Sequence, residues 1–269
     1  MGNIDLHHPR LDISGDGETV ILLNGLLQSK SSWAPFVRLL TPFYRVVCYD
    51  LRNQGSPADS LWDEEVKQDH AGDLADLVEA LGGRPITVVG QSFGARIALD
   101  FAARYPEKVD RLVLAAMASP SLAARYSLVF SNWLRALPED SDDDWLPFAE
   151  AVVPWAFGAR YLQEQPDFVN LYAGNIRTTQ RRAGIAANLR ALLEANSPEG
   201  STRFASLRIN VPALVVNGAD DYLTPPDQLD QALRILPRAT FQVLQQCGHA
   251  VSVEGARDFE RLTLDFLLA

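Results

Sequence analysis

Short apolar runs rich in β-branched residues alternate along the chain with stretches whose apolar positions recur at helical spacing. Runs that are apolar throughout are typical of strands covered on both faces, and such strands form largely parallel sheets. Their alternation with amphipathic helices predicts an α/β fold, with a doubly wound, mostly parallel sheet flanked by helices. The expected strands are 19–25, 44–50, 85–91, 109–117, 211–218 and 239–246, and the expected helices are 31–41, 63–81, 93–105, 227–236 and 255–268.

The alternation stops between about residues 119 and 206, where helical, aromatic-rich sequence interrupted by prolines replaces the strands. This segment is too long for a structureless loop in a compact domain, so it predicts a helical insertion. We expect a core in two parts, 1–118 and 207–269, with the insertion 119–206 as a lid over the carboxyl edge of the sheet. Trp133 and Trp155 of the insertion are candidates to line an apolar substrate pocket, although aromatic residues at helical spacing are also typical of packing.

The composition narrows the classes of partner. The chain has 269 residues, 47% of them hydrophobic, which is enough for a large core. Its formal net charge of −10 disfavours a nucleic-acid partner, because phosphate binding requires concentrated Lys and Arg. No long apolar stretch predicts a membrane span or a signal peptide, so we expect a cytoplasmic protein.

Two features raise the question of a metal, and neither has the pattern of a metal site. Cys48 and Cys247 lie far apart without ligand-like spacing, so buried free thiols are expected. The acidic run 139–144 lacks the glycine and the distal glutamate of a calcium-binding loop, and we interpret it as a solvated loop. The sequence also has no nucleotide, flavin or haem motif, so neither a metal nor a cofactor is expected.

A single serine stands between two glycines at the end of the third predicted strand, in Gly90-Gln91-Ser92-Phe93-Gly94. The glycines permit a turn from strand to helix so tight that the side chain of Ser92 is pushed outward. This position also lies at a helix N-terminus, where unpaired N–H groups and the helix dipole favour negative charge. Ser92 is therefore a candidate nucleophile.

A serine hydroxyl is a weak nucleophile at neutral pH, so this interpretation requires a histidine base and a carboxylate to orient it. His249 follows the last predicted strand, which brings it to the same sheet edge as Ser92. The carboxylate should follow the preceding strand, where Asp220 and Asp221 are adjacent, and the local pattern leaves both open. The other histidines are expected in satisfied or solvent-facing roles, His7 and His8 before the first strand and His70 in a helix.

An acyl-transfer transition state also needs donors for its oxyanion, usually two backbone N–H groups. One is expected from Phe93, directly after the serine, and the other from Leu26, in the loop where Gly25 permits a tight turn. The side chains of Gln28 and Ser32 are further candidates, although polar loop residues are often only solvated. Candidates for contact with the substrate in this region are Asn24, Gly25 and Gln91.

Together these residues resemble the α/β-hydrolase fold family, from about residue 18 to the C-terminus and least clearly in the lid. The resemblance implies a Ser, Asp, His order along the chain, and it favours Asp221 over Asp220 as the acid. The matching motifs are Asn24-Gly25, the turn Gly90 to Gly94, the loop Asp50 to Pro57 with Asp50, Arg52 and Gly55, the set Gly218, Asp221 and Pro225, and the set Gly248, His249 and Glu254.

The chain also departs from the family pattern. Asn24 replaces the usual histidine, Asn53 replaces a glycine and Pro57 replaces a serine. Asn24-Gly25 and the sequence around Asp221 are similar to 3-hydroxyacyl-carrier-protein acyltransferases. In those proteins the serine is usually followed by Trp-Gly-Gly, whereas here Phe93-Gly94-Ala95 follows it. The segment before residue 18 is too short for the family's full pair of opening strands.

The leading hypothesis is a serine hydrolase that cleaves a carboxylic ester, thioester or lactone through a Ser-His-Asp triad and an acyl-enzyme. One alternative is an acyltransferase that passes the acyl group to an acceptor other than water. Another is a C–C bond hydrolase or perhydrolase, and a more distant one is a non-catalytic binding protein on the same fold. The expected partner is an apolar small-molecule acyl substrate, and the oligomeric state stays open.

Overall fold

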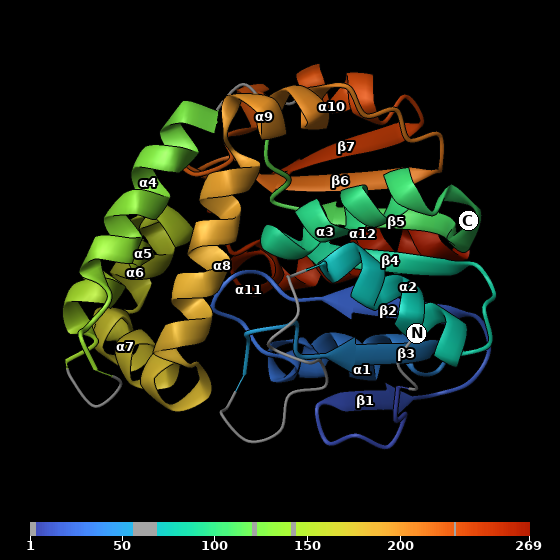
Figure 1. Cartoon of the computed structure of the whole chain (residues 1–269), viewed down its shortest axis with the longest axis horizontal. Helices are drawn as coiled ribbons and strands as arrows, with labels where there is room; N and C mark the ends of the chain where they lie inside the picture. The colour runs from blue at the N-terminus through green and yellow to red at the C-terminus, as the bar shows by residue number, and fades with distance from the viewer. Residues whose placement is uncertain (1–3, 56–68, 120–122, 141–143, 229) are drawn as a thin grey trace.

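The computed structural model describes residues 4–55, 69–119, 123–140, 144–228 and 230–269. Within these residues seven strands form one sheet in the order β1-β3-β2-β4-β5-β6-β7 (Figure 1). β1 pairs antiparallel with β3 and all other pairings are parallel, which confirms the predicted mostly parallel sheet. The strands are β1 (Leu11–Ser14), β2 (Thr19–Leu23), β3 (Arg45–Tyr49), β4 (Ile86–Gln91), β5 (Val109–Ala115), β6 (Ala213–Gly218) and β7 (Ala239–Leu244).

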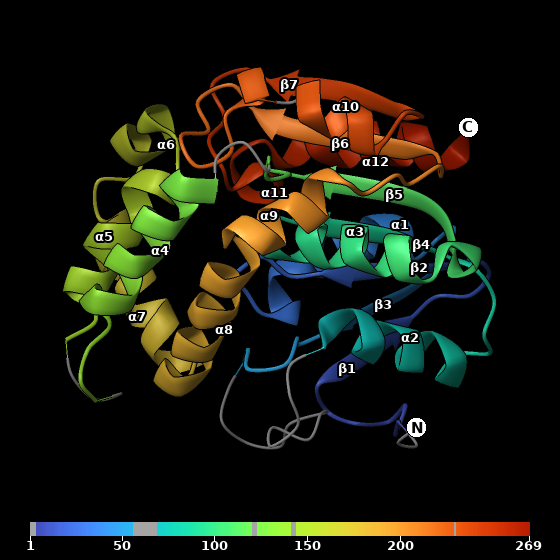
Figure 2. The ribbon, with the colours of Figure 1, turned by 45° about the horizontal axis from the view of Figure 1, so that its top comes forward.

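Alternate side chains of the central strands face two separate layers of helices. On β2, Ile21 and Leu23 belong to the apolar cluster that contains residues of α2 and α3, whereas Val20 and Leu22 belong to the cluster with α1 and α12. Burial on both faces explains why these strands read as apolar throughout. Figure 2 shows the two layers on opposite faces of the sheet. The helices of the core are α1 (Ala34–Leu40), α2 (His70–Ala80), α3 (Phe93–Arg104), α10 (Asp230–Ile235), α11 (Val251–Glu254) and α12 (Ala256–Leu268).

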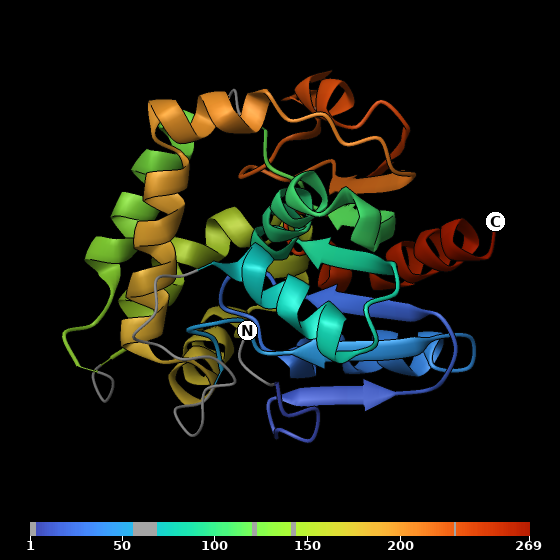
Figure 3. The same ribbon diagram turned by 45° about the vertical axis from the view of Figure 1, so that its right-hand side comes forward.

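The chain between β5 and β6 is helical, in the segment predicted for the lid. Within it α4 packs against α5 and α8, and α5 packs against α7. Figures 1 and 3 show this insertion at one end of the strands, whereas the C-terminus of α12 lies at the other end. The helices are α4 (Ala123–Ala136), α5 (Leu146–Ala156), α6 (Ala159–Glu164), α7 (Phe168–Thr179), α8 (Arg182–Ala195) and α9 (Pro198–Ala205).

The observed element ends differ from the predicted ones where local capping decides them. α2 begins at His70 because the side chain of Asp69 accepts a hydrogen bond from the Gly72 N–H, and residues 63–68 of the predicted helix lie outside the described residues. The helix expected at 31–41 divides into a 3₁₀ turn at Lys30–Trp33 and α1. In the described part of the chain before residue 18, β1 is a single short strand.

Candidate active site

The turn that carries Ser92 is strained and held in place by close packing. Ser92 has φ 52° and ψ −107°, a backbone conformation that side-chain-bearing residues rarely adopt. A side chain at Gly94 would collide with the backbone carbonyl of Leu23, and one at Gly90 would collide with the carbonyl of Gly94. The Ser92 N–H donates to the carbonyl oxygen of Ala115 on β5, at 2.8 Å. The two glycines therefore allow β4 and α3 to approach closely enough to expose the serine at the tip.

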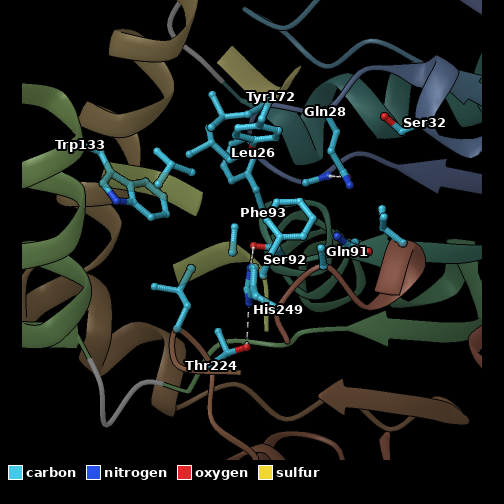
Figure 4. A pocket seen from close by; sticks show the side chains of 18 of the residues that line it. Leu26, Gln28, Ser32, Gln91, Ser92, Phe93, Trp133, Tyr172, Thr224 and His249 are labelled. Carbon is cyan, nitrogen blue, oxygen red and sulfur yellow. Dashed lines mark hydrogen bonds between the residues drawn. The ribbon is translucent and has the colours of Figure 1, made fainter. Parts of the chain in front are cut away.

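Ser92, His249 and Asp221 form one hydrogen-bonded chain. The His249 Nε2 lies 2.7 Å from the Ser92 Oγ, and the His249 Nδ1 lies 2.9 Å from the Asp221 Oδ2. The three residues follow β4, β7 and β6, so the parallel order of the strands brings them to the same edge. Figure 4 shows His249 between Ser92 and the Thr224 side chain.

The environment of Asp221 keeps its carboxylate ionised. Its Oδ1 accepts hydrogen bonds from the N–H groups of Leu223 at 2.8 Å and Thr224 at 2.7 Å, and its Oδ2 accepts one from the Thr224 hydroxyl at 2.5 Å. Burial alone would raise the pKa of Asp221, but the His249 ring and the hydrogen bonds from Thr224 outweigh it and lower this pKa below its usual value. The carboxylate is therefore charged at neutral pH and fixed in one orientation.

The neighbouring carboxylate occupies a different place. The Asp220 N–H donates to the carbonyl oxygen of Cys247 at 2.9 Å, and the residue is partly exposed, whereas Asp221 is 2% exposed. Thr224 was not among the sequence candidates, yet its hydroxyl also lies 3.3 Å from the His249 Nδ1. A lone threonine in a loop gives no sequence signal of this kind, because its contact depends on how the loop folds back.

In the loop after β2, Gly25 lies close to the carbonyl of Gln91, the residue before the serine. The Gln28 N–H donates to the Gly25 carbonyl at 3.3 Å, and the Gln28 Oε1 accepts from the Gly25 N–H at 2.7 Å. A Cβ at Gly25 would lie 2.9 Å from the Gln28 Oε1 and 3.4 Å from the Gln91 carbonyl oxygen, which agrees with the tight turn predicted there. The residue of this loop with positive φ is Leu27, at 65°. The two hydrogen bonds between Gly25 and Gln28 close the loop around Leu27. Phe93 is the first residue of α3, so its N–H has no acceptor within the helix.

Two residues expected to contact the substrate do not line the cavity. Asn24 is fully buried behind the loop, where its Nδ2 donates to the Tyr49 carbonyl at 3.2 Å and its Oδ1 accepts from the Trp33 Nε1 at 3.0 Å. Asn24 therefore fastens the loop to β3 instead of meeting a ligand. Trp155 packs against the core, with the guanidinium of Arg125 5.2 Å from its ring centre.

A cavity of about 570 Å³ lies between the carboxyl edge of the sheet and the insertion. Its size suits a small organic ligand. Among the predicted residues, Gly25, Leu26, Gln91, Phe93 and Trp133 line it together with Ser92 and His249, as do the two further candidates Gln28 and Ser32 (Figure 4). The apolar wall is contributed mainly by the insertion, through Tyr126, Phe130, Val152, Phe157, Phe168 and Tyr172.

The described residues contain no group of three or more His, Cys, Asp or Glu side chains arranged to hold a metal ion. Cys48 and Cys247 are buried and free. Burial raises the pKa of each thiol to about 12, so neither is a reactive thiolate at neutral pH. Within the same residues, no helix is both long and apolar enough to cross a bilayer.

The chain is similar to known proteins both in sequence and in structure. A family model described as "alpha/beta hydrolase fold" matches residues 18–256. The chain is 30% identical to the 2-hydroxy-6-oxononadienedioate/2-hydroxy-6-oxononatrienedioate hydrolase 2 of Pseudomonas putida, across 99% of this chain and 93% of that protein. It is 28% identical to the 2-hydroxy-6-oxononadienedioate/2-hydroxy-6-oxononatrienedioate hydrolase 1 of Dechloromonas aromatica, across 99% of this chain and 92% of that protein.

The crystal structure of the enol-lactonase from Burkholderia xenovorans superimposes with a TM-score of 0.73. The two sequences are 25% identical, and the match covers 96% of each chain. The match therefore extends over nearly the whole length of both chains.

Proposed function

The chain belongs to the alpha/beta hydrolase fold family, and from this premise we propose that it is a serine hydrolase acting on a carboxylic ester, thioester or lactone. The observation that carries the proposal is the unbroken hydrogen-bonded chain from the Ser92 Oγ through His249 to Asp221 beside a cavity. Hydrolysis is also the activity in the names of the relatives. A base within 2.7 Å of a serine hydroxyl has the geometry needed to activate it.

In the first step His249 Nε2 removes the proton of the Ser92 hydroxyl as Oγ attacks the substrate carbonyl carbon. The ionised Asp221 stabilises the resulting imidazolium and holds the ring with Nε2 toward the serine. The N–H groups of Leu26 and Phe93 are assigned to the oxyanion, whose charge is also favoured at the N-terminus of α3.

In the second step His249 gives its proton to the leaving oxygen or sulfur, and the acyl-enzyme on Ser92 remains. A water molecule then loses a proton to His249 and attacks the acyl carbon, which releases the acid and restores the hydroxyl. We assign the insertion the role of a lid, because its apolar side chains exclude water from one side of the cavity.

The second candidate is hydrolysis of a C–C bond, and the relatives favour it. Both relatives compared above carry names of 2-hydroxy-6-oxo-dienedioate hydrolases. The same three residues would serve in this case: Ser92 Oγ attacks the ketone carbon, the adjacent C–C bond breaks with its electron pair on the leaving carbon, and His249 gives that carbon the proton it took from Ser92.

Covalent labelling tests the proposal and a substrate panel separates the two candidates. A fluorophosphonate probe should label the wild-type protein and fail to label Ser92→Ala. If the wild-type protein is not labelled, the proposed nucleophile is wrong. Hydrolysis of phenyl esters and a lactone, without loss of the conjugated chromophore of a 2-hydroxy-6-oxo-dienoate, would support the ester reaction; the reverse pattern would support C–C cleavage.

The assignment of the acid is tested by a matched pair of variants. Asp221→Asn should lower kcat on a phenyl ester by about 10⁴, because the amide cannot stabilise the imidazolium. Asp220→Asn should stay within about twofold of the wild type, since Asp220 does not contact His249. A large loss for Asp220→Asn with little loss for Asp221→Asn would transfer the role to Asp220.

A further inference from the structure

Arg96 lies one helical turn after Ser92 on α3. Its N–H donates to the Ser92 carbonyl at 3.0 Å, and residues four apart lie on the same face of a helix. Its side chain therefore leaves α3 on the side of the nucleophile, and Arg96 is among the residues that line the cavity. The catalytic steps described above do not use this arginine.

Among the described residues Arg96 forms no salt bridge with a carboxylate. Its Nη2 donates to the Ala195 carbonyl at 3.3 Å, and its guanidinium carbon lies 3.9 Å above the centre of the Phe204 ring. Within these residues no carboxylate oxygen lies within 4 Å of its nitrogens. Asp100, four residues further along α3, attracts Arg96 electrostatically, but its ion pairs are with Arg104 at 3.6 Å and with Arg203 at 3.2 Å. A long carbonyl contact and a ring face leave most of the five N–H donors of the guanidinium unused.

Keeping the charged Arg96 guanidinium out of water costs free energy unless an anion pairs with it. Burial lowers the pKa of Arg96 to about 10, which still leaves it charged at neutral pH. A charge in an apolar wall is expensive when it is not paired, and the stacking on Phe204 compensates for only part of this cost. A bound anion would supply the missing partner.

Tyr126 of α4 also lines the cavity and provides a neutral donor. The residue is 2% exposed, and its hydroxyl accepts a hydrogen bond from the Ser119 N–H at 3.2 Å. A phenol that accepts in this way still has its own proton to donate. Tyr126 lines the cavity together with Arg96.

We propose that Arg96 and Tyr126 form a carboxylate subsite, so that the substrate carries a carboxylate in addition to the bond that is cleaved. One guanidinium and one neutral hydroxyl match a single negative charge, and the planar fork of arginine matches the two oxygens of a carboxylate. The substrate class is then an otherwise apolar ester, thioester, lactone or ketone with one acid group. This inference rests on the proposed function for the identity of the substrate.

Calorimetry in the Ser92→Ala background tests the subsite without turnover. The probes are the monophenyl ester of adipic acid and its neutral methyl phenyl diester, which differ at one end only. The monoacid should bind more tightly than the diester. Adding Arg96→Gln should weaken binding of the monoacid by about 10²-fold, because its carboxylate loses the guanidinium as partner. The affinity for the diester should change by no more than about threefold.

Two further variants separate binding from folding. Arg96→Lys keeps the charge without the fork and should retain part of the preference for the monoacid. Arg261→Gln is the matched control, since it removes an exposed positive charge on α12 that lies outside the cavity, and it should leave the preference unchanged.

The carboxylate subsite is wrong if the monoacid and the diester bind equally, or if Arg96→Gln weakens both to the same extent, as loss of a purely structural contact would. A failure of the proposed function is distinguishable from these results. In that case the fluorophosphonate does not label Ser92, whereas the difference in binding between the two probes is still measured.

Discussion

Asp221 and the His70 ring are both ionisable groups removed from water, but Asp221 is charged and His70 is neutral because their hydrogen bonds differ. Asp221 is surrounded by donors from Leu223, Thr224 and His249, and its pKa is lowered despite burial. His70 packs edge-on against the Phe93 ring, with ring centres 5.2 Å apart, and neither of its buried nitrogens has a hydrogen-bond partner among the described residues. Burial disfavours the charged form of both groups. Only Asp221 has hydrogen-bond donors that stabilise its charge, so Asp221 is ionised and His70 is neutral.

His70 makes the stability of the fold depend on pH. Burial is the main cause that lowers its pKa to about 4; Arg52 adds to the effect and Asp69 opposes it. In the unfolded chain a histidine titrates near pH 6.5, so as the pH falls from about 6.5 to about 4 the unfolded state takes up the proton first. The stability attributable to neutral His70 is fully present above about pH 6.5 and is lost toward pH 4, by up to about 3 kcal/mol.

We therefore expect His70→Leu to be less sensitive to acid than the wild type. Urea unfolding at a series of pH values should show that the free energy of unfolding of the variant falls less steeply between pH 6.5 and 4. His7→Gln, at an exposed position, is the control and should follow the wild-type curve. Parallel curves for wild type and His70→Leu would contradict a buried neutral histidine.

At the scale of elements, the turn between β4 and α3 depends on how closely two backbones approach. Gly94 sits against the carbonyl oxygens of Leu23 and Asn24, so a methyl group there must displace backbone. Gly174, inside α7, has no atom within 4 Å of the position that its Cβ would take. The two glycines are both helical and differ only in their surroundings.

The same substitution should thus have opposite effects at the two positions. Gly94→Ala should lower the free energy of unfolding by about 2 kcal/mol and slow fluorophosphonate labelling, because the turn must shift. Gly174→Ala should raise it by up to about 1 kcal/mol, since glycine is a poor helix former. Denaturant unfolding measures both, and equal effects would mean that the close approach at Gly94 is not required.

The elements that the sequence predicts correctly are those with a local physical signal. The buried strands have continuous apolar runs, and the strained turn has two glycines around Ser92, so the sheet and the family were predictable. The positive φ of Leu27 has no signal in the sequence, because leucine does not favour that conformation. The sequence predicts substrate contact for Asn24 and Trp155 because residue type alone does not distinguish a side chain that packs inside the protein from one that lines a cavity.

At the scale of the whole molecule, the insertion is fastened to the core beside His249. The Ala250 N–H donates to the Ala156 carbonyl at 2.9 Å, which joins the end of α5 to the loop after β7. The Glu254 Oε2 accepts from the Gly158 N–H at 2.9 Å and from the Gly248 N–H at 3.0 Å. One carboxylate oxygen therefore connects a residue of the insertion with the residue that precedes His249.

Glu254→Ala should loosen this connection while the core stays folded. We expect faster hydrogen exchange at the amides of Gly158 and Gly248, and a fall in kcat on a phenyl ester of about tenfold, because a charge-assisted hydrogen bond contributes about 1.5–3 kcal/mol and its loss frees the His249 loop. Glu254→Gln keeps an acceptor oxygen and should recover most of the activity. Glu164→Ala, which removes an exposed carboxylate of α6, is the control and should change neither readout. If exchange at Gly158 and Gly248 is unaltered in Glu254→Ala, the insertion is held by its apolar contacts around Phe157 and not by this carboxylate.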